Sequence, residues 1–217
     1  MREFDSTKKP FVYLITEGQT TAENFAEKKK ELFKLVKLAA ESKISFVQIR
    51  EKQLSARLVF ELASVAAKIT SQTTTKILVN DRADIALAAR AAGVHLTSRS
   101  LSAEIIRQNF PTDFIVGVSA HTLEEAETAK QQSADFITFS PIFPTPEKER
   151  YGATQGLDKL REVCEQLRPF PVVALGGING NNYKSVLDSG ASGFAAIRFL
   201  NDWEKLRNLA ADLREKI

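Results

Sequence analysis

The stretch Phe46-Val47-Gln48-Ile49-Arg50-Glu51-Lys52 decides the fold. It begins with apolar, aromatic and β-branched residues and runs into a polar segment, which is typical of a β-strand. Successive strand side chains point to opposite faces, so Gln48, Arg50 and Lys52 share one face. Two interpretations follow. The stretch is either a half-exposed antiparallel strand, or a buried parallel strand whose polar end meets an anionic ligand at the mouth of a barrel.

Apolar strand-like runs recur along the chain, with amphipathic stretches between them. The predicted strands are Phe11–Thr16, Ser45–Arg50, Lys76–Asn80, Gly93–Thr97, Phe114–Ala120, Phe136–Ile142, Pro171–Ile178 and Gly193–Phe199. A helix follows each strand, and the last one covers Asp202–Lys216. Eight alternating units predict an α/β fold, the (β/α)₈ TIM barrel, with residues 1–217 as a single domain. A doubly wound sheet is the alternative, but it rarely needs eight evenly spaced units.

Composition excludes several classes of protein. The chain of 217 residues is 43% hydrophobic and 26% charged, with a net charge of +3, which gives no reason to expect nucleic acid or membrane partners. The single Cys164 cannot form an internal disulfide or a thiolate metal cluster, and we expect it in the core. No apolar run is long enough to span a membrane, and the N-terminus lacks the apolar segment of a secretory signal. We therefore expect a cytoplasmic protein.

Polar residues gather where the predicted strands end, which is where barrels of this kind bind their ligands. This distribution favours the barrel-mouth interpretation of the opening stretch. The residues concerned are Gln48, Arg50, Lys52, Asn80, Asp81, His95, Ser119, His121 and Arg198, together with the loop 141–148 and the pair Gly176-Gly177.

Two of these groups indicate a site for phosphates. The pair Gly176-Gly177 follows a buried strand, and backbone N–H groups of such a loop can approach a phosphate closely, although most glycine pairs are simple turns. Arg198 would add a cation, unless it pairs with a carboxylate such as Asp202.

Asp81 is a candidate Mg²⁺ ligand, or else the cap of the next helix.

Two further side chains have two readings each, and a third has one. Lys148 follows a proline-rich loop and would either reach an anion from a lid or remain a surface charge. His121 would either transfer protons or serve as a structural donor. His95 lies within an apolar strand, and we expect it to be packed and hydrogen bonded.

The motifs taken together resemble the thiamine-phosphate synthase and TenI family. They are VQIREK (47–52), LVNDRADIAL (78–87), GVHL (93–96), GVSAHT (117–122), SPIFPTPEK (140–148), QG (155–156) and ALGGI (174–178). The resemblance covers nearly the whole chain, and VQIREK and PIFPT–K carry most of its weight. It implies a TIM barrel that joins hydroxymethylpyrimidine diphosphate to thiazole phosphate and releases pyrophosphate.

The resemblance also implies roles for individual residues. Gln48, Arg50 and Lys52 would hold the pyrimidine diphosphate, with Asn80 nearby and Asp81 as a Mg²⁺ ligand. Ser119 and Lys148 would contact the leaving pyrophosphate. Thr145 would lie on the thiazole phosphate side, and Gly177, beside Gly176, would bind that phosphate through its backbone N–H. Such a site stabilises charge that develops on a leaving group and needs no nucleophilic Ser or Cys.

The sequence departs from the synthase pattern after the fourth strand. Ser100 stands where the resemblance leads us to expect a second acidic Mg²⁺ ligand, and Arg99 adds positive charge beside it. Arg198 also occupies a position that is usually small. These departures leave Mg²⁺ binding open.

Alternatives to the synthase therefore remain. A TenI-like thiazole tautomerase would use His121 as its acid and base, although it has no diphosphate for the cationic residues to hold. A non-catalytic regulatory relative that binds a thiamine precursor is another reading. An isomerase or aldolase on an unrelated phosphate-binding barrel would need a catalytic Lys or Glu whose side chain points inward from a strand. The only candidate is Lys52, at the end of a strand. The synthase reading is preferred, with small-molecule substrates as partners and homo-oligomerisation left open.

Overall fold

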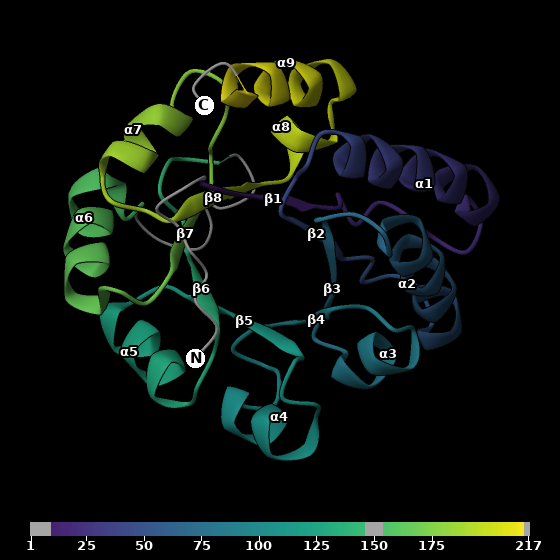
Figure 1. Cartoon of the computed structure of the whole chain (residues 1–217), viewed down its shortest axis with the longest axis horizontal. Coiled ribbons are helices and arrows are strands. Elements are labelled where there is room, and N and C mark those ends of the chain that lie inside the picture. The colour runs from purple at the N-terminus through teal and green to yellow at the C-terminus, as the bar shows by residue number, and fades with distance from the viewer. Residues whose placement is uncertain (1–9, 146–153, 215–217) are drawn as a thin grey trace. The chain divides into compact units, whose positions relative to one another are not determined.

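The computed structural model describes residues 10–145 and 154–214. Its eight strands form a closed barrel in the order of the sequence, which confirms the predicted (β/α)₈ fold (Figure 1). The strands are β1 (Phe11–Ile15), β2 (Phe46–Ile49), β3 (Lys76–Asn80), β4 (Gly93–Leu96), β5 (Ile115–Ala120), β6 (Phe136–Phe139), β7 (Val172–Leu175) and β8 (Gly193–Ala196). The described helices are α1 (Phe25–Glu41), α2 (Ala56–Thr70), α3 (Ala83–Ala88), α4 (Ala103–Asn109), α5 (Leu123–Gln131), α6 (Gly156–Leu167), α7 (Tyr183–Asp188), α8 (Arg198–Asn201) and α9 (Trp203–Arg214).

The chain divides into two compact units, which are described separately. The first contains the described residues up to Val12 together with His95–Ala196. The second contains Tyr13–Val94 and the described residues from Ile197 onward. The organisation of residues 1–217 as a single domain stays a prediction.

In the second unit, β1, β2 and β3 pair in parallel, with Ile15 opposite Gln48 and Gln48 opposite Leu78. All four residues of β2 are buried, as expected of a parallel strand that is covered on both faces. Helices α1 and α2 lie side by side (Figure 1). Helix α1 buries Leu32, Leu35, Val36, Leu38 and Ala39, and this spacing gives it one apolar stripe.

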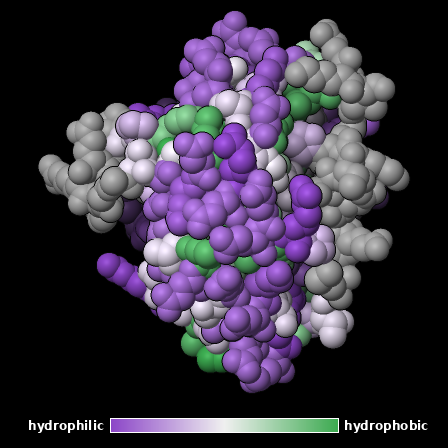
Figure 2. All heavy atoms as spheres, turned by 90° about the vertical axis from the view of Figure 1, so that its left-hand side faces the viewer, coloured by the Kyte–Doolittle hydropathy of each residue, from purple (hydrophilic) through white to green (hydrophobic). Residues whose placement is uncertain are grey.

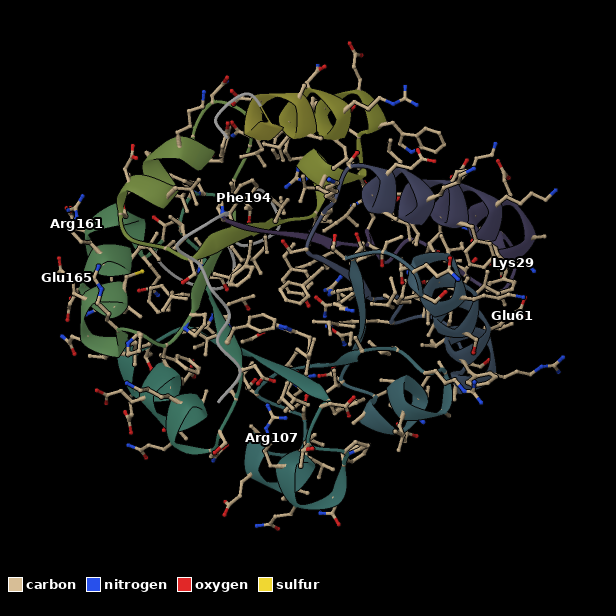
Figure 3. All side chains as sticks on the ribbon, viewed as in Figure 1. Lys29, Glu61, Arg107, Arg161, Glu165 and Phe194 are labelled. Atoms are coloured by element: carbon tan, nitrogen blue, oxygen red, sulfur yellow. The ribbon has the colours of Figure 1, made fainter. Side chains whose placement is uncertain are left out.

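In the first unit, β5 to β8 pair in parallel, and the residues of β6 and β8 are buried. Arg107 on α4, labelled in Figure 3, fastens this helix to the strands. Its guanidinium donates to the carbonyls of Ser133 and Phe114 and to the Asp135 carboxylate, which also accepts from the N–H of Val116. The arginine therefore satisfies three acceptors from two different loops.

The outer helices of the first unit carry the polar surface. Figure 2 shows the face formed by α5, α6 and α7, which is mainly hydrophilic. Arg161 and Glu165 lie on the outer side of α6 (Figure 3), whereas Leu160, Val163, Cys164 and Leu167 are buried. Cys164 therefore lies in the core as predicted. Among the residues that the structure describes, no helix is long and apolar enough to cross a membrane.

The predicted strands are correct in order but too long at several C-terminal ends. β2 ends at Ile49 rather than Arg50, and β6 ends at Phe139 rather than Ile142. β8 ends at Ala196, and the predicted end of this strand forms the short helix α8. The cause is that Ile142, Phe199 and Leu200 remain buried after the strands end, so the apolar run continues although the extended backbone does not.

Candidate functional site

A directed chain of hydrogen bonds joins β1, β2 and β3 in the second unit. Burial raises the pKa of Tyr13 well above its usual range, so its hydroxyl keeps its proton and donates to Oε1 of Gln48 at 3.2 Å. The Nε2 atom of Gln48 donates to Oδ1 of Asn80 at 2.9 Å, and Nδ2 of Asn80 donates to Oδ2 of Asp81 at 2.7 Å. Each donor thus points along the chain toward the Asp81 carboxylate. The structure brings together three predicted site residues: Gln48, Asn80 and Asp81.

Arg50 and Lys52 lie beyond the end of β2. The strand alternation that placed them on one face with Gln48 therefore does not extend to them, and that argument was wrong. Arg50 is half-buried, whereas Lys52 lies in an exposed turn. Their predicted role as ligands of a diphosphate stays a prediction.

The loop after β1 fixes the backbone around Arg50. The N–H of Arg50 donates to the Thr16 hydroxyl at 2.8 Å, and the buried carboxylate of Glu51 accepts from the N–H of Thr20 at 3.0 Å. Gly18 has a φ of +75°, and a Cβ there would lie 3.2 Å from Nη1 of Arg50. Glycine at this position lets the loop lie directly against the arginine.

Asp81 has an unusual backbone. Its φ is +59°, and the N–H of Arg82 donates to the Asn80 carbonyl across it at 2.7 Å, which makes Asp81 the centre of a γ-turn. A positive φ costs a non-glycine residue free energy, although aspartate tolerates it better than most residues do, and such strain also occurs at functional sites. Arg82, not Asp81, occupies the N-cap position of α3, so the alternative reading of Asp81 as a helix cap is not supported.

The residues present suit a magnesium ion with one protein carboxylate. In the described residues, no group of three or more His, Cys, Asp or Glu side chains could hold a metal ion. In the first unit, the hydroxyl of Ser100 accepts from the N–H of Thr97 at 2.7 Å, so it closes a local turn. Mg²⁺ commonly binds one or two carboxylates and completes its shell with substrate phosphates and water. Asp81 fits that pattern.

Ser119 on β5 has a histidine beside it. Its Oγ lies 3.0 Å from Nε2 of His95, and the same ring nitrogen lies 3.3 Å from Oγ1 of Thr138. His95 and Thr138 are buried, and Ser119 is half-buried. The prediction that His95 is packed and hydrogen bonded is confirmed.

His121 follows β5 on an exposed turn. Its Nδ1 lies 2.8 Å from the Ser140 carbonyl, and because a carbonyl can only accept, Nδ1 carries the proton. In the neutral imidazole, Nε2 would then be the acceptor. Gln155 donates to the His121 carbonyl, and Glu125 accepts from its N–H, so the turn is held at both ends.

Gly176 and Gly177 make room for the loop after β6. Their φ angles are +105° and +66°. A Cβ on Gly176 would lie 2.9 Å from Cα of Pro141, and one on Gly177 would lie 2.6 Å from Cβ of Phe143. The N–H of Phe143 donates to the Gly176 carbonyl at 3.0 Å. These glycines therefore have a packing role, and phosphate binding by their N–H groups stays a prediction.

The remaining predicted residues are placed less fully. Thr145 is half-buried, and its Oγ1 is buried without a hydrogen-bond partner in the part of the chain that the structure describes. Lys148 lies outside the described residues. Arg198 was predicted to lie at the end of β8, but it is the first residue of α8. Asp202 pairs with Lys205 at 2.7 Å.

Sequence reasoning missed two features of these groups. One is the buried Glu51, which lies between two cations in the sequence and holds the loop after β1. The other is Tyr13, whose hydroxyl begins the chain of hydrogen bonds to Asp81. A carboxylate inside a cationic run was the available signal for Glu51. Tyr13 gave no signal, because its partner is 35 residues away.

Comparison with known proteins agrees with this arrangement of motifs. The family model described as thiamine monophosphate synthase matches residues 12–200. A thiamine-phosphate synthase of Methanocella arvoryzae is 37% identical over 180 residues, which cover 83% of this chain and 84% of that protein. One from Clostridium botulinum is 34% identical over 202 residues, which cover 93% of this chain and 95% of that protein.

A solved structure gives the same relationship. The thiamine phosphate pyrophosphorylase of Pyrococcus furiosus superposes with a TM-score of 0.76 and 28% identity, over 94% of this chain and 96% of that one. Fold and sequence thus agree over nearly the whole chain. The chain belongs to the thiamine monophosphate synthase family.

Proposed function

We propose that this chain is a thiamine-phosphate synthase, an alkyl transferase that joins hydroxymethylpyrimidine diphosphate to thiazole phosphate and releases pyrophosphate. The observation that carries the proposal is the family match over residues 12–200, within which the hydrogen-bonded group Gln48, Asn80 and Asp81 falls on the family's motifs. The substrates are small molecules.

The residues that we assign to the diphosphate are chiefly cationic. Arg50 and Lys52 would bind its oxygens, and the N–H of Arg50 is already fixed by Thr16. Ser119 and Lys148 would contact the pyrophosphate as it leaves, while Gln48 and Asn80 would hold the pyrimidine diphosphate in place. Thr145, Gly176, Gly177 and Arg198 would serve the thiazole phosphate.

Charge separation is the difficult part of this reaction. The bond between the pyrimidine methylene carbon and the diphosphate oxygen breaks, and its electron pair leaves with pyrophosphate. The thiazole nitrogen then donates its lone pair to the carbon and forms the new C–N bond. Cationic side chains stabilise the leaving group as its charge develops, so they lower the barrier more than they strengthen substrate binding. The attacking nitrogen needs close approach but no protein base.

We also propose that Asp81 holds a Mg²⁺ ion together with oxygens of the bound diphosphate. When bound, the ion would neutralise negative charge on the leaving group. The γ-turn at Asp81 and the donor from Asn80 orient the carboxylate for this purpose. Because Ser100 replaces the second acidic ligand, we expect weaker Mg²⁺ binding than a site with two carboxylates would give.

A second function is favoured by one observation. Nδ1 of His121 faces the Ser140 carbonyl at 2.8 Å, which leaves Nε2 as the ring nitrogen for exchanging a proton with a substrate. A TenI-like tautomerase would use this nitrogen as its acid and base. This alternative uses His121 and leaves the cationic residues without a role.

One experiment separates the two functions. Purified protein is supplied with the pyrimidine diphosphate and thiazole phosphate, with and without Mg²⁺, and in parallel with the thiazole carboxylate phosphate tautomers. The proposal predicts thiamine phosphate in the first reaction. Tautomer conversion that requires His121, without any coupling, would replace the synthase by the tautomerase. Binding of a substrate with neither reaction would favour a regulatory relative.

A further inference from the structure

The first unit has a buried histidine directly behind Ser119. His95 is 3% exposed and lies on β4, with its Nε2 atom 3.0 Å from Oγ of Ser119 and 3.3 Å from Oγ1 of Thr138. Its ring packs against Phe136, with ring centroids 6.0 Å apart. Two strands, β5 and β6, thus each direct one hydroxyl at the same ring nitrogen.

The neighbouring strand makes space for this ring. Gly117 lies two residues before Ser119, and a Cβ on it would be 2.8 Å from Nδ1 of His95 and 2.4 Å from Cζ of Phe136. Contacts that short do not occur between real side chains, so any larger residue would displace the imidazole or the phenyl ring. The absence of a side chain at Gly117 therefore allows the contact between His95 and Ser119.

The protonation of Nε2 determines what Ser119 can do. If Nε2 carries no proton, it accepts from a hydroxyl, and the proton of Ser119 would point at the ring. The serine would then present lone pairs to an approaching anion. If Nε2 carries the proton, it donates to the Ser119 oxygen, and the hydroxyl proton can turn toward an anionic oxygen.

We propose that His95 is a positioning residue that donates from Nε2–H to Ser119 Oγ and thereby makes the Ser119 proton available to the departing pyrophosphate. The proposal rests on the proposed function through the contact of Ser119 with pyrophosphate. A single N–H that is shared between two hydroxyl oxygens is consistent with the distances of 3.0 and 3.3 Å. His95 itself touches no substrate.

Nitrogen NMR tests the tautomer without any substrate. The chain has two histidines, so in ¹⁵N-labelled protein the signals of His95 are identified by their persistence in the His121→Gln variant. The proposal predicts the Nε2–H tautomer for His95. The Nδ1–H tautomer would overturn it, because Nε2 could then only accept from the serine.

Kinetics tests the consequence. We expect His95→Leu to lower kcat for coupling by roughly 10- to 100-fold, as Ser119→Ala does, with little change in KM, because a charge-assisted hydrogen bond to the leaving group is lost. The double variant should be no slower than either single one. His95→Gln, whose amide can donate near the position of Nε2, should retain most of the wild-type kcat.

Two results contradict the positioning role in a protein with normal coupling. The first is that His95→Leu and Ser119→Ala act independently. The kcat of the double variant would then fall by the product of the two single-variant factors. The second is a His95→Gln variant as slow as His95→Leu although circular dichroism shows both to be folded. Absence of coupling in the wild type would instead overturn the proposed function, and the NMR measurement would still decide whether His95 donates to Ser119.

Discussion

The side-chain amide of Gln48 donates to Oδ1 of Asn80 at 2.9 Å, and this bond joins β2 to β3 at the Asp81 turn. The Tyr13 hydroxyl donates to Oε1 of the same amide, so the nitrogen and the oxygen of the Gln48 side chain both have partners inside the protein. The amide therefore contributes to stability as well as to the arrangement of the site. Its contribution can be separated from that of its partner by a double-mutant cycle.

We predict that Gln48→Ala and Asn80→Ala are coupled by about 1 kcal/mol in the free energy of unfolding, as expected for one partly buried hydrogen bond. Urea unfolding of the two single variants and the double variant measures this coupling. Asn109, whose amide bonds to the Ile105 carbonyl on α4, provides the control partner. Gln48→Ala and Asn109→Ala should be additive, and equal coupling in both cycles would contradict a specific bond to Asn80.

Arg50 provides the clearest test of leaving-group stabilisation. We predict that Arg50→Ala lowers kcat/KM for coupling by about 10²-fold or more, because a cation beside the developing pyrophosphate charge is lost. Arg57 is exposed on α2, and Arg57→Ala serves as the matched control with near-normal kinetics. Steady-state assays of both variants suffice. A normal rate for Arg50→Ala would remove this residue from the mechanism.

Gly177 tests the packing of the loop after β6. We predict that Gly177→Ala lowers the free energy of unfolding by more than about 1 kcal/mol, because the residue has a positive φ and its Cβ would meet Phe143. Gly156 has a similar φ of +72° but open space around its Cβ. Gly156→Ala should therefore show the backbone cost alone. Equal destabilisation by the two substitutions would mean that the close contact with Phe143 costs nothing.

Cys164 should make stability depend on pH in the alkaline range. Burial raises the pKa of its thiol from the ordinary value of 9.0 to about 12. Between these values the unfolded chain releases the proton and the folded chain keeps it. The thiol's contribution is therefore complete below pH 9 and is lost as the pH rises toward about 12.

The measurement compares wild type with Cys164→Ala by urea unfolding at pH about 8 and about 10.5. We expect the stability of the wild type relative to the variant to fall at the higher pH. Tyr13 also has a raised pKa, but it is present in both proteins, and its effect cancels. A difference that does not change with pH would show that the buried thiol ionises equally in both states.

The sequence was sufficient to predict the order of strands and helices, because apolar runs and amphipathic stretches alternate eight times. It was less informative at strand ends. Arg50 was assigned to the second strand because apolar, aromatic and β-branched residues precede it, but the strand stops at Ile49. Arg198 was assigned to the end of the last strand, which was predicted to reach Phe199, yet Phe199 is buried in α8.

Contacts between distant residues account for what sequence reasoning missed. His95 was expected to be packed, but its contact with Ser119 depends on the register of β4 and β5 and on the space left at Gly117. In the same way, the positive φ of Asp81 follows from its turn and not from its residue type alone. Motifs identified the residues, and their partners required the structure.

The stoichiometry of the coupling reaction tests the central claim most directly. Purified protein is incubated with the pyrimidine diphosphate, thiazole phosphate and Mg²⁺, and thiamine phosphate and pyrophosphate are quantified in the same sample over many turnovers. The account predicts equal amounts of both products, with formation slowed strongly in Arg50→Ala. Pyrophosphate without thiamine phosphate, or neither product at any Mg²⁺ concentration, would contradict it.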